Sequence, residues 1–460
     1  MKKLSYKQKS SAAEPAGTTV GFLALGCPKN IVDSETMLAR IGLAGFILTD
    51  DIDRPDILVI NTCGFIAPAK DEALAAIRKA IAQKKKGLIK KLIVTGCLTQ
   101  RLGEELLALA PGIDALIGLA GRDSIDAVIK ELSSSDQSRP AMLLAPAPQG
   151  PPDDRNRLLI NPPHWAYLRI SDGCSRKCSF CTIPFIRGKF KSKPMDIILD
   201  EAKQLTDNGA VELSIIAQDS NFYGQDLGQK DGLVKLIEQL DKIPSLKWIR
   251  LMYLYPAGID DALIETIAQN PKVLHYIDMP IQHISNQILK AMHRNDTKRN
   301  TLGLIEKLRT RIPDAVLRTT VITGFPGETA AHFQELLDFL GWAKFDALGC
   351  FPFYPEPGTE AALMSGQLPE SVRKRRAQFV MKTQQPIAFA QIERFVGKNI
   401  AVLVDRRADS SGNALGRFYG QAPHIDGVCT IKNCTAPAGA FVNAVVTARQ
   451  GYDLLVEQAK

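Results

Sequence analysis

Short apolar runs alternate with amphipathic stretches between residues 19 and 132. The apolar runs read TVGFLAL, DILVINTC and KLIVTGC, and each is followed by a stretch with helical periodicity: NIVDSETMLARIGLAG, APAKDEALAAIRKAIAQ and LTQRLGEELLALA. This alternation is typical of βαβ units and predicts an open parallel sheet covered by helices. We therefore expect an N-terminal α/β domain over residues 19–132.

The same alternation returns over residues 164–395. Six apolar runs are separated by helical stretches: WAYLRIS, VELSIIAQ, KWIRLMYL, YIDMPI, AVLRTTVITGF and DALGCFPF. Six such units predict a partial (β/α)6 barrel, whose chemistry lies at the carboxyl ends of its strands. The connecting helix that follows carries a basic run at residues 373–376, which we interpret as a solvated face.

Turn-forming residues mark the remaining two segments. Residues 133–163 include SSSDQSRP and APAPQGPPDD, a composition that predicts an extended, partly mobile linker. Residues 396–460 contain short apolar runs between turn residues, including GKNIAVLVDR and GVCTIKN. This pattern predicts a small antiparallel β-barrel at the C-terminus.

Composition is that of a globular protein with two or three domains. Of the 460 residues, 45% are hydrophobic and 23% are charged, and no apolar run reaches the length of a membrane span. The N-terminal segment MKKLSYKQKSSAAEPAGTTVG lacks an apolar stretch of signal-peptide length. We expect a cytoplasmic protein with reduced thiols and no membrane partner. The net charge of +8 permits a nucleic-acid or ribosomal partner without requiring one.

The strongest chemical signal is a cysteine triplet that follows the run WAYLRIS. Cys174, Cys178 and Cys181 form a Cys-x3-Cys-x2-Cys motif. Three thiolates can hold three irons of a 4Fe–4S cluster and leave the fourth iron open to a small molecule. A structural zinc site usually has paired cysteine knuckles and four ligands, and the triplet has no second pair nearby. The motif therefore favours an open cluster.

A second set of cysteines is dispersed along the first domain. Cys27, Cys63 and Cys97 each lie at the carboxyl end of a predicted strand. Ligands of open parallel sheets bind at this edge, so the three thiols are expected to converge and hold a second cluster. The alternative is three unrelated buried thiols. Cys429 and Cys434 are interpreted as small apolar residues of the C-terminal barrel.

The chain resembles the methylthiotransferase family of radical S-adenosylmethionine (SAM) enzymes from residue 19 to 457. The resemblance rests on the two cysteine sets, on Phe180 inside the triplet and on the C-terminal barrel. The resemblance implies SAM bound at a 4Fe–4S cluster on the triplet. It also implies an auxiliary 4Fe–4S cluster on the dispersed cysteines and a C-terminal TRAM domain.

Four segments resemble the branch that adds a methylthio group to the β-carbon of an aspartate in ribosomal protein S-12: LGCPKNIVDSE, CSFCTIPFIRGKFKSKP, IIAQDSNFYG and GQAPHIDGV. One alternative is the branch that modifies an adenosine next to the tRNA anticodon. Another is a non-catalytic RNA-binding or zinc-storing protein. The implied partners are S-12 or the small ribosomal subunit, an electron donor such as flavodoxin or ferredoxin, and RNA at the TRAM domain.

The resemblance also implies contacts to SAM. No catalytic residue is assigned beyond the cluster ligands. The implied cofactor-binding residues are Phe180, Gln218, Asp219, Gly324, Gly327, Glu328 and His283. His283 has the alternative role of a hydrogen-bonded structural imidazole. Arg187 and Gly188 are expected to shape the cluster loop or to meet an acidic substrate side chain.

The C-terminal segment departs from the family at one position, where His424 replaces an acid in QAPHIDG. Electrostatic docking of a basic ribosomal protein then depends on a local acidic face. We expect Asp405, Asp409, Asp426 and Asp453 to form it.

Overall fold

The computed structural model describes residues 17–134, 139–148 and 150–459. Most of the N-terminal segment that we used to argue against a signal peptide, residues 1–16, lies outside this range. Contacts divide the chain into two compact units. The first comprises residues up to 160 with 172–176 and 182–193, and the second comprises 161–171, 177–181 and everything from 194 onward. None of the described helices combines the length and the apolar character needed to cross a bilayer.

The first unit is built on a parallel sheet of six strands in the order β2-β1-β3-β4-β5-β6. The strands are β1 (Thr19–Ala24), β2 (Ile47–Thr49), β3 (Ile57–Thr62), β4 (Lys91–Gly96), β5 (Ala115–Ile117) and β6 (Ala141–Leu143). Its helical segments are α1 (Pro28–Leu43), α2 (Ala67–Lys85), α3 (Cys97–Leu102), α4 (Glu105–Leu109), η1 (Leu119–Ser124), α5 (Ile125–Ser134) and α6 (Ile183–Arg187).

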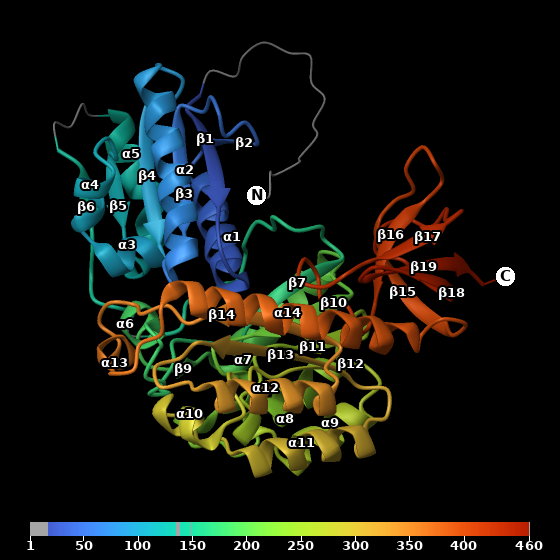
Figure 1. Cartoon of the computed structure of the whole chain (residues 1–460). Helices are drawn as coiled ribbons and strands as arrows, with labels where there is room; N and C mark the ends of the chain where they lie inside the picture. The colour runs from blue at the N-terminus through green and yellow to red at the C-terminus, as the bar shows by residue number, and fades with distance from the viewer. Residues whose placement is uncertain (1–16, 135–138, 149, 460) are drawn as a thin grey trace. The chain divides into compact units, whose positions relative to one another are not determined.

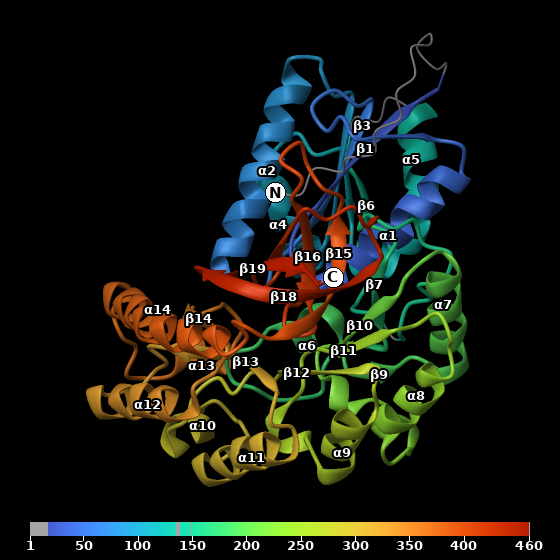
Figure 2. The ribbon, with the colours of Figure 1, turned by 90° about the vertical axis from the view of Figure 1, so that its right-hand side faces the viewer.

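Both faces of this sheet are covered. Figure 2 shows α2 on one face and α1 with α5 on the other. Leu74 and Ile77 of α2 belong to one buried apolar cluster, whereas Met37 of α1 and Ile129 of α5 belong to the other. Every residue of β3 is buried because helices lie on both sides of a central parallel strand. This explains why the strands are continuous apolar runs in the sequence.

The range predicted as a linker contributes to this unit. Residues 141–143 form β6, which pairs in parallel with β5 and ends the sheet. Arg157 donates to the buried carboxylate of Glu35 at 2.9 Å, and Lys193 donates to buried Asp154 at 2.8 Å. These parts of the range are therefore packed rather than extended in solvent. A strand of three residues is too short for its sequence pattern to stand out among prolines.

The second unit contains an open parallel sheet in the order β14-β13-β12-β11-β10-β7. Its strands are β7 (Trp165–Arg169), β10 (Glu212–Ile216), β11 (Trp248–Leu251), β12 (Val273–Asp278), β13 (Val316–Thr323) and β14 (Ala347–Pro352), the six expected runs. Its longer helices are α7 (Met195–Asp207), α8 (Gly232–Asp241), α9 (Asp261–Gln269), α10 (Asn286–Ala291), α11 (Lys298–Arg311), α12 (Ala330–Ala343), α13 (Glu360–Leu363) and α14 (Glu370–Glu393).

Short elements fill the connections. They are β8 (Ser171–Asp172), β9 (Lys191–Ser192), η2 (Ser220–Phe222), η3 (Gln225–Leu227) and η4 (Pro256–Gly258). Figure 1 shows α14 running along β14, the edge strand of the sheet. The partial (β/α)6 barrel expected from the sequence is confirmed.

A closed barrel of five strands completes the second unit, in the order β15-β16-β17-β19-β18. The strands are β15 (Asn399–Arg406), β16 (Ala414–Phe418), β17 (Cys429–Lys432), β18 (Phe441–Gln450) and β19 (Asp453–Gln458). All pairs are antiparallel except β17 with β19. Buried Arg417 of β16 donates to Glu212, the first residue of β10, at 2.6 Å. This buried ion pair fixes the small barrel to the larger sheet.

The acidic face expected on the small barrel does not form at two of its four positions. Asp405 accepts from Arg417 at 2.7 Å and faces His164 at 2.9 Å. Burial opposes the charge of Asp405, but these hydrogen bonds and the Arg417 charge outweigh it and lower the pKa of the carboxyl. Asp426 is partly buried and accepts from Tyr276 at 2.7 Å, and loss of solvation raises the pKa of its carboxyl. Both carboxyls serve internal contacts.

Candidate active site

The three dispersed cysteines meet at the carboxyl edge of the first sheet. Cys27 precedes α1, Cys63 follows β3, and Cys97 opens α3 directly after β4. The strands β1, β3 and β4 are neighbours, so their ends lie side by side. The Cys97 Sγ atom lies 3.5 Å from Oδ1 of Asn30, whose amide also donates to the Thr62 carbonyl, next to Cys63, at 2.8 Å. Asn30 therefore lies next to Cys97 and next to the residue before Cys63, which supports the expected convergence.

Glycines make this convergence possible. Gly26 has φ of +93°, and a Cβ atom there would lie 2.7 Å from Cβ of Cys63. Gly96, before Cys97, has φ of +97°, and its Cβ would lie 2.2 Å from Oδ1 of Asn61. Only glycine combines this backbone conformation with such close neighbours.

Burial disfavours the thiolate form of two of these three cysteines. Burial raises the pKa of Cys97 to about 12, and burial with the neighbouring Cys27 raises the pKa of Cys63 to about 11. Such thiols stay protonated at neutral pH unless a metal replaces the proton. In the described part of the chain, no three cysteine, histidine or carboxylate groups stand close enough to share one metal ion. A cluster does not need that spacing, because each thiolate binds a different iron.

A buried arginine connects this cysteine edge to the segment that carries Cys174. Arg187 is only 2% exposed and ends α6. Its guanidinium donates to Asn30 at 2.9 Å, to Asp33 at 2.7 Å, and to both carboxylate oxygens of Asp172 at 3.2 and 3.1 Å. Burial opposes the arginine charge, but the carboxylates of Asp172 and Asp33 outweigh it and hold the Arg187 pKa well above its usual value. Arg187 therefore remains a cation beside the dispersed thiols.

The second part of this network reaches the triplet. Asp172 also accepts from the backbone N–H of Gly173 at 2.9 Å, and the N–H of Cys174 donates to the Gly188 carbonyl at 3.1 Å. Arg187 and Gly188 thus hold the backbone that leads into Cys174. The sequence drew attention to Arg187 and Gly188, but the acidic groups around Arg187 belong to this chain.

Cys178 and Cys181 lie in the second unit, in a loop tied to α10 and α13. The N–H of Cys181 donates to the Cys178 carbonyl at 3.1 Å. Ser179 donates from its N–H to the Met292 carbonyl at 3.2 Å, and its own carbonyl accepts from Ala361 at 2.8 Å. These bonds fix the loop from both sides.

Four of the expected SAM-contacting residues gather around this loop. The ring of Phe180 meets the edge of Phe325, with centroids 6.5 Å apart, next to Gly324. Gly327 lies in the same turn, and its N–H donates to the Gly366 carbonyl at 3.0 Å. Glu328 accepts from the Gly324 N–H at 2.7 Å and from Arg376 at 2.5 Å. The Glu328 carboxylate therefore stabilises the turn from Gly324 to Glu328.

His283 is fully buried beside this loop. Its Nδ1 accepts from the Ser285 N–H at 3.0 Å, and its Nε2 lies 3.6 Å from the Glu328 carboxylate. These contacts fit the structural alternative for the imidazole. Gln218 and Asp219 follow β10 at the carboxyl edge of the sheet, and Asp219 is buried.

Two residues at this edge of the sheet were not singled out from the sequence. The Arg294 guanidinium stacks on the ring of Tyr255 at 3.9 Å and donates to the Pro280 carbonyl at 2.8 Å. Burial raises the pKa of Tyr255, and Cys178 lies close enough to add to this shift. Tyr255 follows β11, so its strand-end position was the available clue.

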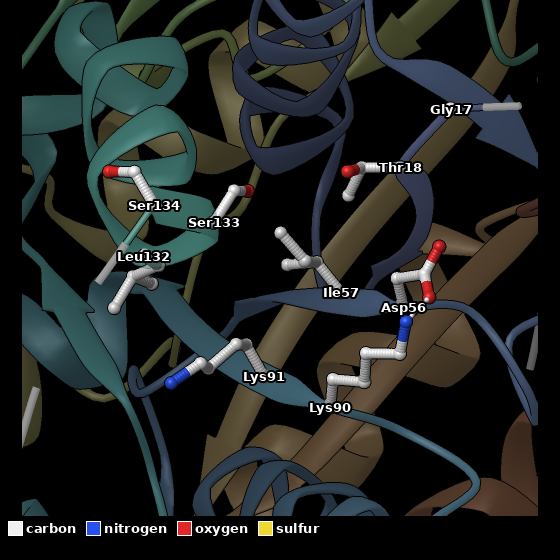
Figure 3. Close-up of a pocket in the computed structure, with 9 residues that line it drawn as sticks. All are labelled: Gly17, Thr18, Asp56, Ile57, Lys90, Lys91, Leu132, Ser133 and Ser134. Atoms are coloured by element: carbon white, nitrogen blue, oxygen red, sulfur yellow. Dashed lines mark ion pairs between the residues drawn. The ribbon is translucent and has the colours of Figure 1, made fainter. Parts of the chain in front are cut away.

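A separate cavity of 810 Å³ lies at the opposite, amino edge of the first sheet. Figure 3 shows Thr18, Asp56, Lys90 and Ser134 around it, with Lys90 paired to Asp56 at 2.7 Å. No cysteine lines it. It is therefore distinct from the candidate site.

Three family models match separate segments of the chain. Residues 19–118 match the Uncharacterized protein family UPF0004, residues 168–340 match the Radical SAM superfamily, and residues 396–458 match the TRAM domain. Among solved structures, the radical SAM methyltransferase TsrM from Kitasatospora setae aligns with a TM-score of 0.56 at 14% identity, covering 75% of this chain and 77% of that one. At this identity the likeness shows the fold alone.

Curated relatives are much closer. Ribosomal protein uS12 methylthiotransferase RimO of Symbiobacterium thermophilum is 42% identical over 95% of this chain and 90% of its own length. The protein of the same name from Desulforamulus reducens is 42% identical over 96% of this chain and 100% of its own. That from Clostridioides difficile is 41% identical over 95% and 98%, respectively. With these domains and relatives, the chain belongs to the RimO family of radical SAM methylthiotransferases.

Proposed function

We propose that this protein adds a methylthio group to the β-carbon of an aspartate in ribosomal protein uS12, using two 4Fe–4S clusters and SAM. Family membership supports the reaction. The observation that carries the two-cluster proposal is the convergence of Cys27, Cys63 and Cys97 at one sheet edge, in a chain that also has the triplet. Each set supplies three thiolates, so each cluster would keep one iron without a protein ligand.

The two sets of proposed cysteine ligands would hold two different clusters. Cys174, Cys178 and Cys181 would hold the cluster that binds SAM, and the dispersed set would hold the auxiliary cluster. When bound, these cofactors supply reductive cleavage of SAM, hydrogen abstraction and delivery of methylthio sulfur. Such chemistry is needed because an unactivated C–H bond has no pKa within reach of acid–base groups.

The chain's own residues orient these groups. The hydrogen bonds of Ser179 hold the Cys178–Cys181 loop, and Phe180 packs beside the turn at Gly324. We propose that the backbone of this turn, with Gly327 exposed at its tip, and Gln218 with Asp219 contact SAM. Glu328 would hold the turn in place, because its carboxylate accepts from the Gly324 N–H. His283 would position that carboxylate, because its Nε2 lies 3.6 Å away.

The same proposal includes partners and location. The reaction consumes one electron for each SAM that is cleaved, so a flavodoxin or ferredoxin is proposed as donor. The C-terminal barrel matches the TRAM domain, and RNA contact at the small ribosomal subunit is proposed for it. A cytoplasmic location follows from a ribosomal substrate.

Mass spectrometry of uS12 and of bulk tRNA from cells lacking this gene tests the substrate. The expected result is uS12 lighter by one methylthio group with tRNA modification unchanged, and restoration when the gene is returned. Unchanged uS12 together with tRNA that has lost its methylthio groups would assign the chain to the tRNA branch. Purified protein containing zinc without iron or sulfide would refute both.

A further inference from the structure

The outer face of α14 is an exposed basic surface. Between residues 371 and 392 the chain has five basic residues and no acidic one. Arg375, Phe379 and Lys382 recur at helical spacing on the side opposite the buried Ala377, Val380 and Gln384. Phe379 is 52% exposed, which is unusual for a large aromatic side chain. In the described part of the chain, Arg375 and Lys382 have no ion-pair partner.

The inner face of the same helix holds the loop next to the triplet. Arg376 donates to the Glu328 carboxylate at 2.5 Å and to its carbonyl at 2.8 Å. Arg373 donates to the Phe353 carbonyl and packs against Gly324. The first turns of α14 therefore pack directly against the turn that we propose for SAM.

A chain of aromatic contacts continues from this helix to the cluster loop. The ring of Phe353 meets Phe325 with centroids 5.2 Å apart, and Phe325 meets Phe180 at 6.5 Å. Phe180 stands between Cys178 and Cys181 in the sequence. The first turns of α14 are thus connected to the loop that carries Cys178 and Cys181 by one hydrogen bond to the Phe353 backbone and by the three packed rings.

We propose that Arg375, Phe379 and Lys382, the α14 face, form the docking surface for an acidic one-electron carrier protein. This inference rests on the proposed function, which requires an electron for SAM cleavage. The reduced carrier would lose one electron, and the carbon–sulfur bond of SAM would break to give methionine and a deoxyadenosyl radical. Charge complementarity selects an acidic carrier, and one exposed aromatic residue suits the small interfaces of redox partners.

A ribosomal RNA segment would also be attracted to a basic helix. Arg375, Phe379 and Lys382 lie in the first and middle turns of α14, and Arg376 in the same turns contacts the loop beside the triplet. The helix meets the small barrel that matches the TRAM domain near its other end, where Glu393 pairs with Arg449 at 2.9 Å. This position favours the electron carrier. RNA binding at this face is therefore an outcome that the experiment must separate.

The test compares two sources of electrons. Arg375→Glu with Lys382→Glu reverses the α14 face. The matched control is Lys235→Glu on α8 with Lys242→Glu at the residue that follows this helix, which has the same spacing in the sequence and the same charge change. Release of deoxyadenosine is measured with dithionite and with a bacterial flavodoxin reduced by its reductase. We expect the α14 variant to lose about tenfold or more of its flavodoxin-driven rate at low salt, while its dithionite rate is unchanged. The control should keep both rates.

Other outcomes would contradict the docking surface or the proposed function. Equal flavodoxin-driven rates in the α14 variant, the control and the parent would overturn the docking surface. A normal flavodoxin-driven rate combined with lost modification of small ribosomal subunits would also overturn it and assign the face to RNA. If the iron-loaded parent releases no deoxyadenosine with dithionite, the proposed function itself fails.

Discussion

Replacing Arg187 with methionine tests whether one buried cation organises the cysteine edge of the first unit. The change keeps most of the side-chain volume but removes the hydrogen bonds to Asn30, Asp33 and Asp172. Asp33 keeps its bond to Arg122 at 2.5 Å, so the loss falls mainly on Asp172 and Asn30. Asn30 is the residue that approaches the Cys97 sulfur.

The magnitude follows from burial. Removing one member of a buried, hydrogen-bonded charge network costs about 3 to 5 kcal/mol. For a unit of this size, 1 kcal/mol corresponds to about 2 to 4 °C in unfolding temperature, so a fall of about 6 to 20 °C is expected. Arg40→Met is the matched control, because Arg40 forms an exposed ion pair with Asp123 at 3.3 Å. Exposed pairs contribute about 1 kcal/mol or less.

Calorimetry of the reduced, iron-free proteins measures this difference. A second measurement is the iron content after anaerobic reconstitution in a background where Cys174, Cys178 and Cys181 are serine. In that background Arg187→Met should lower the remaining iron, and Arg187→Lys should lie between methionine and the parent, because lysine keeps the charge but not the planar fork. Parent-like unfolding temperature and full iron loading in Arg187→Met would refute the reasoning.

Two further variants probe other parts of the fold. Gly26→Ala should lower the amount of iron held by the dispersed cysteines, because the new Cβ would lie 2.7 Å from Cβ of Cys63. Gly45→Ala is the control, because Gly45 has a similar φ of +90° but its Cβ would meet nothing within 4 Å. Equal iron loss in both variants would contradict a steric cause. Glu212→Gln should weaken the loss of folding stability at acid pH. In the parent, burial opposes the Glu212 charge, but Arg417 and Arg250 outweigh it and lower the Glu212 pKa. The stabilisation from this carboxylate is therefore present above the unfolded pKa of about 4.3 and is lost as pH falls through the folded pKa. Urea midpoints between pH 3 and 7 measure this, and parallel curves for parent and variant would contradict it.

The sequence predicted the features that repeat locally. All six apolar runs of the larger sheet became strands, because parallel strands covered on both faces must be continuously apolar. The convergence of the dispersed thiols followed from one rule about strand ends. Neither prediction needed knowledge of side-chain contacts.

Contacts between distant residues were not predictable in this way. Asp33 and Arg187 are 154 positions apart, and no periodic pattern links them. The stacking of Arg294 on Tyr255 and the ion pair of Arg417 with Glu212 are of the same kind. Glu328 shows a related limit: its motif predicts a glycine-rich turn but not that the carboxylate points back to Gly324.

Iron analysis with Mössbauer spectroscopy on two reconstituted proteins tests the two-cluster account most directly. The parent should hold about eight irons per chain, and the variant with serine at Cys27, Cys63 and Cys97 should hold about four. That variant should still release deoxyadenosine from SAM but leave uS12 unmodified. About four irons in the parent, or the same iron content in both proteins, would contradict the account.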